Sequence, residues 1–147
     1  MTIRIRKATP ADLPRALEIW RAAVDATHGF IAPQDRAEID IMVEREHLPT
    51  VDLWVATDEA DTVQGFLGMG EGEIDSLFVD PAMHGCGFGT ALVGHALKLV
   101  PGARVDASEQ APQAVAFYER RGFVRTGRSE TDPAGRPYPL VHFRHSA

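Results

Sequence analysis

The stretch HGCGFGT, residues 84–90, constrains the fold more than any other, because it places three glycines at alternate positions between two apolar segments. The strand-like run LFV precedes it, and apolar residues at helical spacing follow it. Glycine permits positive φ and leaves backbone N–H groups uncovered. At the start of a helix these donors favour an anion such as a pyrophosphate. The sequence therefore predicts a phosphate-binding turn, with a turn that binds nothing as the alternative.

Two familiar phosphate loops do not fit this stretch. A P-loop needs Lys and then Ser or Thr after its last glycine, whereas Thr90 and Ala91 follow Gly89. A dinucleotide fingerprint counted from Gly85 needs its third glycine where Thr90 stands. That fold also places its loop after the first strand, and several predicted strands precede this loop. We therefore do not predict a nucleotide-binding module of either kind.

The N-terminal part of the chain predicts a short strand and two helices. Ile3 and Ile5 alternate with charged residues, as in a half-buried strand. Thr9 and Asp12 are spaced as in a capping box. One apolar stripe of the first helix is then expected to contain Leu13, Leu17, Trp20 and Val24. DATHGF interrupts that pattern, so His28 lies in a turn before a second helix over residues 33–43.

The rest of the chain predicts an antiparallel meander, the helix after the glycine loop, a strand, a helix and a final strand pair. These strands are expected at residues 52–57, 63–70, 73–79, 103–108, 124–130 and 138–144. The last helix is expected over APQAVAFYERRGF and is closed by Gly122. The fold class is α/β or α+β with a mixed sheet, in one domain over residues 1–147.

Composition limits the class of function. The formal charge of −6 argues against sequence-independent binding of nucleic acid, which needs clustered Lys and Arg. Cys86 is the only cysteine, no apolar run is long enough to span a membrane, and the first residues lack the apolar centre of a signal peptide. We therefore expect a cytoplasmic protein. The histidines show no metal-ligand spacing, so no metal is predicted.

The segments LFVDP, HGCGFGTALV and AVAFYERRGF, in this order, resemble the GCN5-related N-acetyltransferases, the GNAT superfamily. AVDATHGF and GRPYPL also resemble one small bacterial subgroup of it. The resemblance covers nearly the whole chain. It implies a mostly antiparallel sheet of about seven strands flanked by about four helices, with acetyl-CoA as co-substrate and a primary amine, either a small molecule or a protein lysine, as acceptor.

The same resemblance implies a cofactor site made of the loop amides and the strand before them. The implied residues are Leu77, Phe78, Val79, His84, Gly85, Cys86, Gly87, Phe88, Gly89, Thr90 and Tyr118. His84 departs from the usual Gln or Arg, and Ala111 stands where the family often has an Asn that reaches the pantetheine arm. Since the amides act regardless of side chain, the binding mode is expected to survive both departures.

Acyl transfer to an amine needs a neutral amine, a donor for the oxyanion and a proton for the departing thiolate. The resemblance implies that Tyr118 supplies the proton and that a backbone N–H near Val79 supplies the donor. A core aromatic is the alternative for Tyr118. Adjacent Phe117 and Tyr118 point to different sides of a helix, which favours the catalytic role.

The general base is left open. Glu73 occupies the position of a catalytic glutamate in some family members, and Asp75 shares its strand face. His28 lies in the turn that covers the acceptor pocket of the family, and Asp25 adds an acidic group for a cationic acceptor. A carboxyl with a pKa of about 4 needs a raised pKa or a water relay to deprotonate an ammonium with a pKa of about 10.4.

The sequence thus predicts an N-acetyltransferase in which the amine attacks acetyl-CoA directly in a ternary complex. The alternative is a CoA- or acyl-CoA-binding sensor with little turnover, which Ala111 and the open choice of base favour. A covalent mechanism through Cys86 has little support. The acceptor is left open, and so is the oligomeric state, monomer or homodimer.

Overall fold

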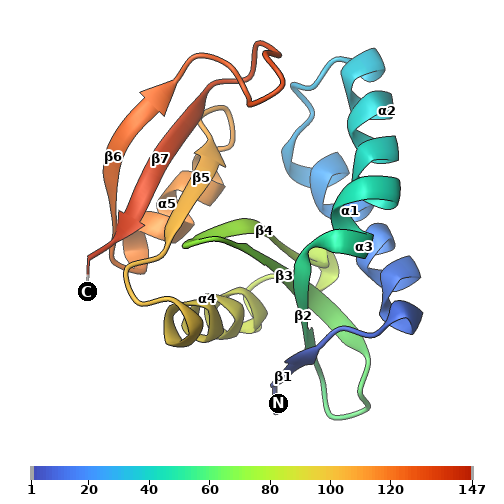
Figure 1. Cartoon of the computed structure of the whole chain (residues 1–147). Helices are drawn as coiled ribbons and strands as arrows, with labels where there is room; N and C mark the ends of the chain where they lie inside the picture. The colour runs from blue at the N-terminus through green and yellow to red at the C-terminus, as the bar shows by residue number, and fades with distance from the viewer. Residues whose placement is uncertain (1, 147) are drawn as a thin grey trace.

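The computed structural model describes residues 2–146 and places seven strands in one sheet, in the order β1-β2-β3-β4-β5-β7-β6 (Figure 1). All neighbours are antiparallel except β4 and β5, which are parallel. The strands are β1 (Arg4–Lys7), β2 (Asp52–Thr57), β3 (Val63–Gly70), β4 (Glu73–Val79), β5 (Arg104–Ser108), β6 (Phe123–Ser129) and β7 (Leu140–His145). The predicted class, meander and final strand pair are confirmed.

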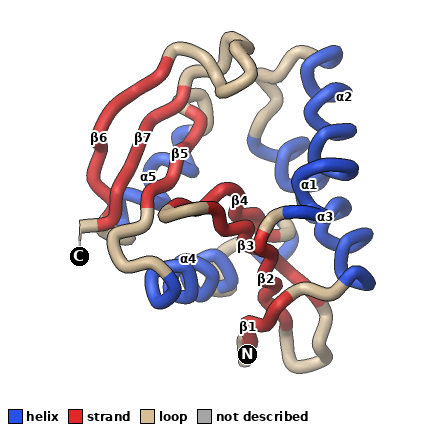
Figure 2. Tube along the Cα trace, in the orientation of Figure 1, coloured by secondary structure: helices blue, strands red, loops and turns tan. Residues whose placement is uncertain are grey.

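The helices cover both faces of this sheet (Figure 2). They are α1 (Leu13–Thr27), α2 (Pro33–Met42), α3 (Leu48–Thr50), α4 (Phe88–Leu99) and α5 (Pro112–Arg120). One core cluster lies between α1 and strands β2 and β3, and the other lies between the sheet and the helices α4 and α5. No helix between residues 2 and 146 is long and apolar enough to cross a membrane.

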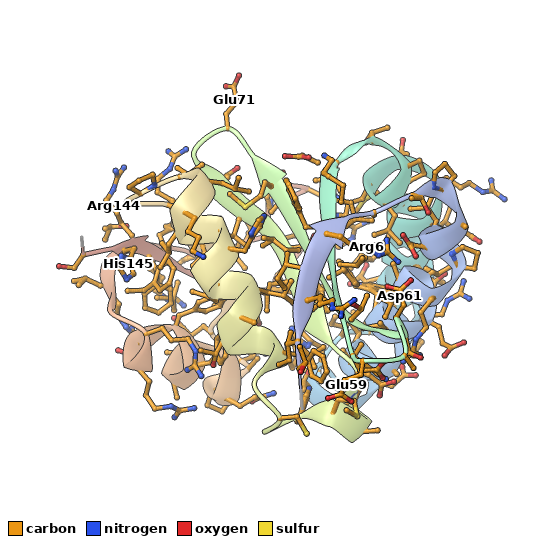
Figure 3. All side chains as sticks on the ribbon, turned by 90° about the horizontal axis from the view of Figure 1, so that it is seen from below. Arg6, Glu59, Asp61, Glu71, Arg144 and His145 are labelled. Carbon is orange, nitrogen blue, oxygen red and sulfur yellow. The ribbon has the colours of Figure 1, made fainter. Side chains whose placement is uncertain are left out.

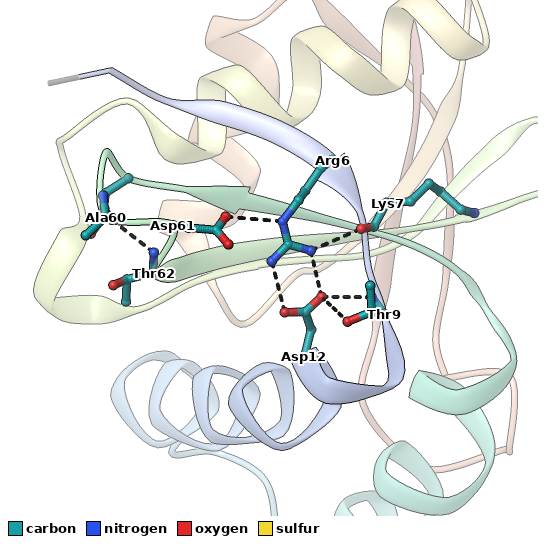
Figure 4. Close-up of polar contacts among 8 residues, drawn as sticks. Arg6, Lys7, Thr9, Asp12, Ala60, Asp61 and Thr62 are labelled. Atoms are coloured by element: carbon teal, nitrogen blue, oxygen red, sulfur yellow. Dashed lines mark hydrogen bonds and ion pairs between the residues drawn. The ribbon is translucent and has the colours of Figure 1, made fainter.

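The start of α1 is fixed to β1 by a buried acid (Figure 4). The Asp12 carboxylate accepts hydrogen bonds from the Thr9 backbone N–H at 2.8 Å and from both terminal nitrogens of Arg6 at 2.8 and 3.1 Å. The Arg6 guanidinium holds the pKa of Asp12 at about 2. The predicted role of Thr9 and Asp12 at this helix start is confirmed, although one turn of 3-10 helix precedes α1.

Most residues predicted for the apolar stripe of α1 are buried. Fewer of those predicted for the second helix are buried. Leu17, Trp20 and Val24 are buried. Met42, the last residue of α2, is 40% exposed, whereas Val43, directly after α2, is buried. The chain then passes through a π-helical turn, Val43–His47, which has more residues per turn than an α-helix. At the last residue of this turn, Nε2 of His47 lies 2.9 Å from the Ser76 hydroxyl on β4.

Candidate active site

The glycine loop joins β4 to α4 through one 3-10 turn, and its glycines have different roles. Gly85 and Gly87 have φ of 80° and 97°, in the left-handed region. Gly89 is needed for space, because a Cβ there would lie 3.1 Å from the Phe117 ring on α5. Ala91 N–H donates to the Gly87 carbonyl at 3.0 Å, so the preceding helical N–H groups point out of the helix start.

A cavity of about 480 Å³ lies against this loop, within the size range of small-molecule sites. Eleven of the residues predicted from the sequence line it: His28, Leu77, Phe78, Val79, His84, Gly85, Gly87, Phe88, Gly89, Thr90 and Tyr118. Cys86 lies in the loop with an exposed thiol and does not line the cavity. Nε2 of His84 turns back to the Val79 carbonyl at 3.3 Å.

Two arginines at the end of α5 also line this cavity, and the sequence reasoning missed them. The Arg121 guanidinium lies over the Phe117 ring at 3.8 Å and donates to the Thr90 hydroxyl at 2.6 Å. Burial and the charge of Arg120 lower the pKa of Arg121. Among the described residues neither arginine pairs with a carboxylate. The mouth of the cavity therefore carries uncompensated positive charge.

A second cavity, of about 120 Å³, opens where β4 and β5 diverge. The two strands pair only at Glu73 with Arg104 and at Ile74 with Val105, which leaves the later part of β4 free along one edge. Asp75, Ser76 and Asp106 line this smaller cavity. His28, Leu77, Phe78, Ala114 and Tyr118 line both cavities.

A β-bulge at Asp75 sets which side chains face which cavity. Gly68 pairs with Ser76 and Met69 pairs with Ile74, so Asp75 is the extra residue on β4. Its carboxylate lies over Gly70, where a Cβ would be 2.5 Å from Oδ2. The bulge breaks the simple alternation that the sequence suggests for this strand.

Tyr118 packs in the core and also lines both cavities. Its ring packs edge-on against Phe117 and Phe123, with centroids 5.3 and 5.4 Å apart, and it is 7% exposed. The Tyr118 ring therefore faces the core, a position that the sequence-based prediction leaves to Phe117. It nevertheless lines both cavities. Burial raises the pKa of Tyr118, so the phenol stays protonated.

The structure does not bring Glu73 to either cavity. It begins β4, about 13 Å along the strand from Leu77. Figure 3 shows Glu71, in the adjoining turn, at the opposite end of the sheet from Glu59 and Asp61, which mark the end where β4 finishes. Burial, and next the neighbouring Asp75, raise the pKa of Glu73.

Of the acceptor candidates His28 and Asp25, only His28 lines the cavities. His28 follows α1 and lines both cavities, with Nδ1 2.6 Å from the Thr27 hydroxyl. Burial lowers the pKa of His28, which leaves its ring neutral at neutral pH. Asp25 lines neither cavity and instead forms an ion pair with Arg36 on α2.

The loop between β6 and β7 reaches across to α2 (Figure 1). The Tyr138 hydroxyl donates to the Asp35 carboxylate and accepts the Ala32 N–H at 3.0 Å. Arg136 pairs with Glu38 at 3.0 Å. Sequence spacing could not have revealed these contacts, since about one hundred residues separate the partners.

Comparison with known proteins places this architecture in a family. Residues 49–125, just over half of the chain, match the family described as acetyltransferase (GNAT) domain. The peptidyl-lysine N-acetyltransferases YjaB of Escherichia coli K12 and Salmonella typhimurium LT2 are 42% and 44% identical to this chain. The alignments cover 99% and 97% of this chain and 98% and 97% of those proteins.

Solved structures agree. The solution structure of apo YjaB from Escherichia coli matches with a TM-score of 0.94 and 41% identity, over 100% of this chain and 99% of that one. PaiA N-acetyltransferase from Thermoplasma acidophilum in complex with coenzyme A matches with a TM-score of 0.78 and 20% identity, over 99% and 100% of the two chains, a likeness of fold. The predicted family and fold are confirmed, and the chain belongs to the GNAT acetyltransferases and is an N-acetyltransferase.

Proposed function

We propose that this enzyme transfers the acetyl group of acetyl-CoA to a primary amine, foremost a protein lysine, by direct attack in a ternary complex. The observation that carries the proposal is the junction of the two cavities at Tyr118, beside the free edge of β4. A cofactor entering along the glycine loop would present its thioester there, and an amine would approach through the gap between β4 and β5. The peptidyl-lysine activity named for the YjaB relatives supports lysine as acceptor.

The larger cavity suits the phosphates of acetyl-CoA. The amides at the start of α4 and the positive end of its dipole favour an anion. Arg121, held over Phe117 and bonded to Thr90, adds a fixed guanidinium beside them. This arginine offers a charged contact where the side chain of His84 turns away to Val79.

The free edge of β4 suits the pantetheine arm and the oxyanion. Asp80 N–H donates to Gln64 on β3 at 2.9 Å. Because N–H directions alternate along a strand, the N–H of Val79 points to the open edge, and so does that of Leu77. A donor at Val79 could stabilise the oxyanion, and amides of the arm could pair with the same edge.

Tyr118 would act on the departing sulfur. A thiol titrates near pH 8.5, and burial raises the pKa of Tyr118 above that of an ordinary phenol. The phenol is therefore a weaker acid than the thiol that it would form. Its contribution would begin as a hydrogen bond to the developing thiolate, which needs no ionised phenolate.

An acyl-CoA sensor with little turnover is the second candidate. Ala111 is fully buried at the start of α5 and offers no polar side chain to the pantetheine arm. Glu73 lies outside both cavities. A sensor would bind acetyl-CoA and release CoA no faster with amines than without them.

The test is mass spectrometry after incubation with acetyl-CoA and a mixed library of amines and lysine peptides. Transfer adds about 42 Da to the acceptor, and peptides with blocked lysine and N-terminal amines serve as the control. Acetylated lysine peptides support the proposal. Tight binding of acetyl-CoA without any acetylated product would favour the sensor instead.

A further inference from the structure

Three polar side chains from three strands form a chain on the open face of β5, β7 and β6. Asp106 on β5 lies directly opposite His142 on β7, and its Oδ1 is 2.6 Å from Nδ1 of the histidine. Nε2 of the same ring is 2.6 Å from the Ser129 hydroxyl on β6. All three point away from α5, since Val105, Val141 and Phe143, their neighbours along the strands, belong to the core beneath.

The hydrogen-bonding capacity of each group decides which atom donates and which accepts in this row of three side chains. An ionised carboxylate only accepts hydrogen bonds, so the proton shared with Asp106 belongs to Nδ1 of His142. In the tautomer with the proton on Nδ1, Nε2 accepts a hydrogen bond from the Ser129 hydroxyl. The histidine and the serine thus hold one oxygen of the Asp106 carboxylate in place. The other oxygen, Oδ2, has no hydrogen bond within residues 2–146.

The carboxylate end of this hydrogen-bonded row lies at the smaller cavity. Asp106 lines the smaller cavity together with Tyr118 and Leu77, and those two residues also line the cofactor cavity. The other candidate groups are placed differently. Glu73 lines neither cavity, and the Asp75 carboxylate lies over Gly70 although Asp75 lines the smaller cavity. His28 lines both cavities with Nδ1 bonded to Thr27, but among the described residues it is not part of a hydrogen-bonded network across strands like that of Asp106.

We propose that Asp106 binds the ammonium group of the acceptor and takes its proton through a relaying water molecule, with His142 and Ser129 as positioning residues. This inference rests on the proposed function. The nitrogen loses two protons: Asp106 takes the first and later returns it to water, and the second ends on the CoA sulfur. The nitrogen–carbon bond forms, the carbon–sulfur bond breaks with its electron pair leaving on sulfur, and the products are amide, CoA thiol and one proton.

Variants of these residues test the assignment, using steady-state kinetics with saturating acetyl-CoA and, as acceptor, the unacetylated form of a lysine peptide that mass spectrometry shows to be acetylated by the parent. Asp106→Asn should lower kcat about 100-fold, within the range of general-base effects. The matched control is Glu109→Gln, which removes a carboxylate from its ion pair with Arg128 at the end of β5 and lines neither cavity. The control should keep kcat and KM within twofold.

The positioning role of His142 and Ser129 is tested by comparing kcat between variants that keep and variants that remove their hydrogen bonds. His142→Asn keeps an N–H near the place of Nδ1, whereas His142→Leu removes it. The leucine variant should lose at least tenfold in kcat, the asparagine variant should regain most of that loss, and Ser129→Ala should lose about threefold. Each variant should bind acetyl-CoA within twofold of the parent, as measured by thermal shift, which also establishes folding.

Two results would overturn this inference while leaving the proposed function intact: kcat of Asp106→Asn within threefold of the parent, or equal losses in the leucine and asparagine variants. If Asp106→Asn does not fold, the comparison of kcat between His142→Leu and His142→Asn tests the inference instead. A parent enzyme that acetylates no amine in the library would overturn the proposed function and this inference with it.

Discussion

The proposed cofactor side and the proposed acceptor side of this site differ in how their residues lie along the chain. The cofactor side consists of β4 from Leu77, the glycine loop, the start of α4 and the end of α5, mostly one continuous segment. The acceptor side draws His28, Asp75 and Asp106 from three separate elements, and the partners His142 and Tyr138 from two more regions. A site made from one continuous segment leaves a motif that can be recognised in the sequence. A site assembled from distant segments does not.

Tyr118 stands where the two sides meet, so its hydroxyl should affect turnover and not cofactor binding. Tyr118→Phe keeps the buried ring and removes the proton donor, and we expect turnover to fall by about 10²–10⁴-fold. No hydrogen bond of this hydroxyl is present within residues 2–146, so the phenylalanine leaves no partner unpaired. Turnover within threefold of the parent would make Tyr118 a core aromatic only.

Gly87→Val should weaken the binding of acetyl-CoA without changing the residues of the acceptor side. At φ of 97° a β-branched residue is strained by about 1–3 kcal/mol, although only Ile3 lies near the added Cβ, at 3.6 Å. If the loop must keep this conformation to bind phosphate, affinity for acetyl-CoA should fall by about 5- to 150-fold.

Thermal shift measures that loss. Acetyl-CoA at 100 times its Kd should stabilise the parent by about 2.7 kcal/mol. Gly102→Val is the control, because that glycine also has positive φ, at 75°, and lines neither cavity. Equal losses of affinity in both variants would mean that the loop assignment is wrong.

Tyr138→Phe should weaken the acceptor side alone. The change removes the hydrogen bonds that tie the β6–β7 loop to Asp35 and Ala32 on the α2 side. A net loss of about 1 kcal/mol should raise KM for the lysine peptide about fivefold. The Kd of acetyl-CoA should not change. A rise in the acetyl-CoA Kd as large as the rise in KM would show that the two sides are not separable.

The smallest expected effect concerns pH. Burial lowers the pKa of His28, and it lowers that of His95 on α4 in the same direction. Below about pH 6.5 the unfolded chain takes up protons that the folded protein resists, so stability should fall as pH falls from 6.5 toward the lowered pKa. His28→Gln and His95→Gln should each flatten this slope in thermal melts. Only His28→Gln should also raise KM for the acceptor.

Much of the fold was predictable from local patterns. Period-two segments predicted the strands, and the stripe of Leu17, Trp20 and Val24 predicted α1. Strand and helix periods are set by backbone geometry, so apolar residues at those spacings reveal elements before any tertiary contact is known. The glycine loop was readable for the same reason, since positive φ at Gly85 and Gly87 is a local requirement.

The sequence and its family resemblance indicated His28 and Asp75 on the acceptor side, but the rest of that side was decided by tertiary structure. The bulge at Asp75 interrupts the alternation of β4, and the divergence of β4 from β5 opens the gap that Asp106 lines. Glu73 matched a family position in the sequence, yet its place at the far end of β4 keeps it out of both cavities. Strand order and register depend on side chains packing across long sequence separations, so no local spacing could have placed Asp106 beside His142 and Ser129.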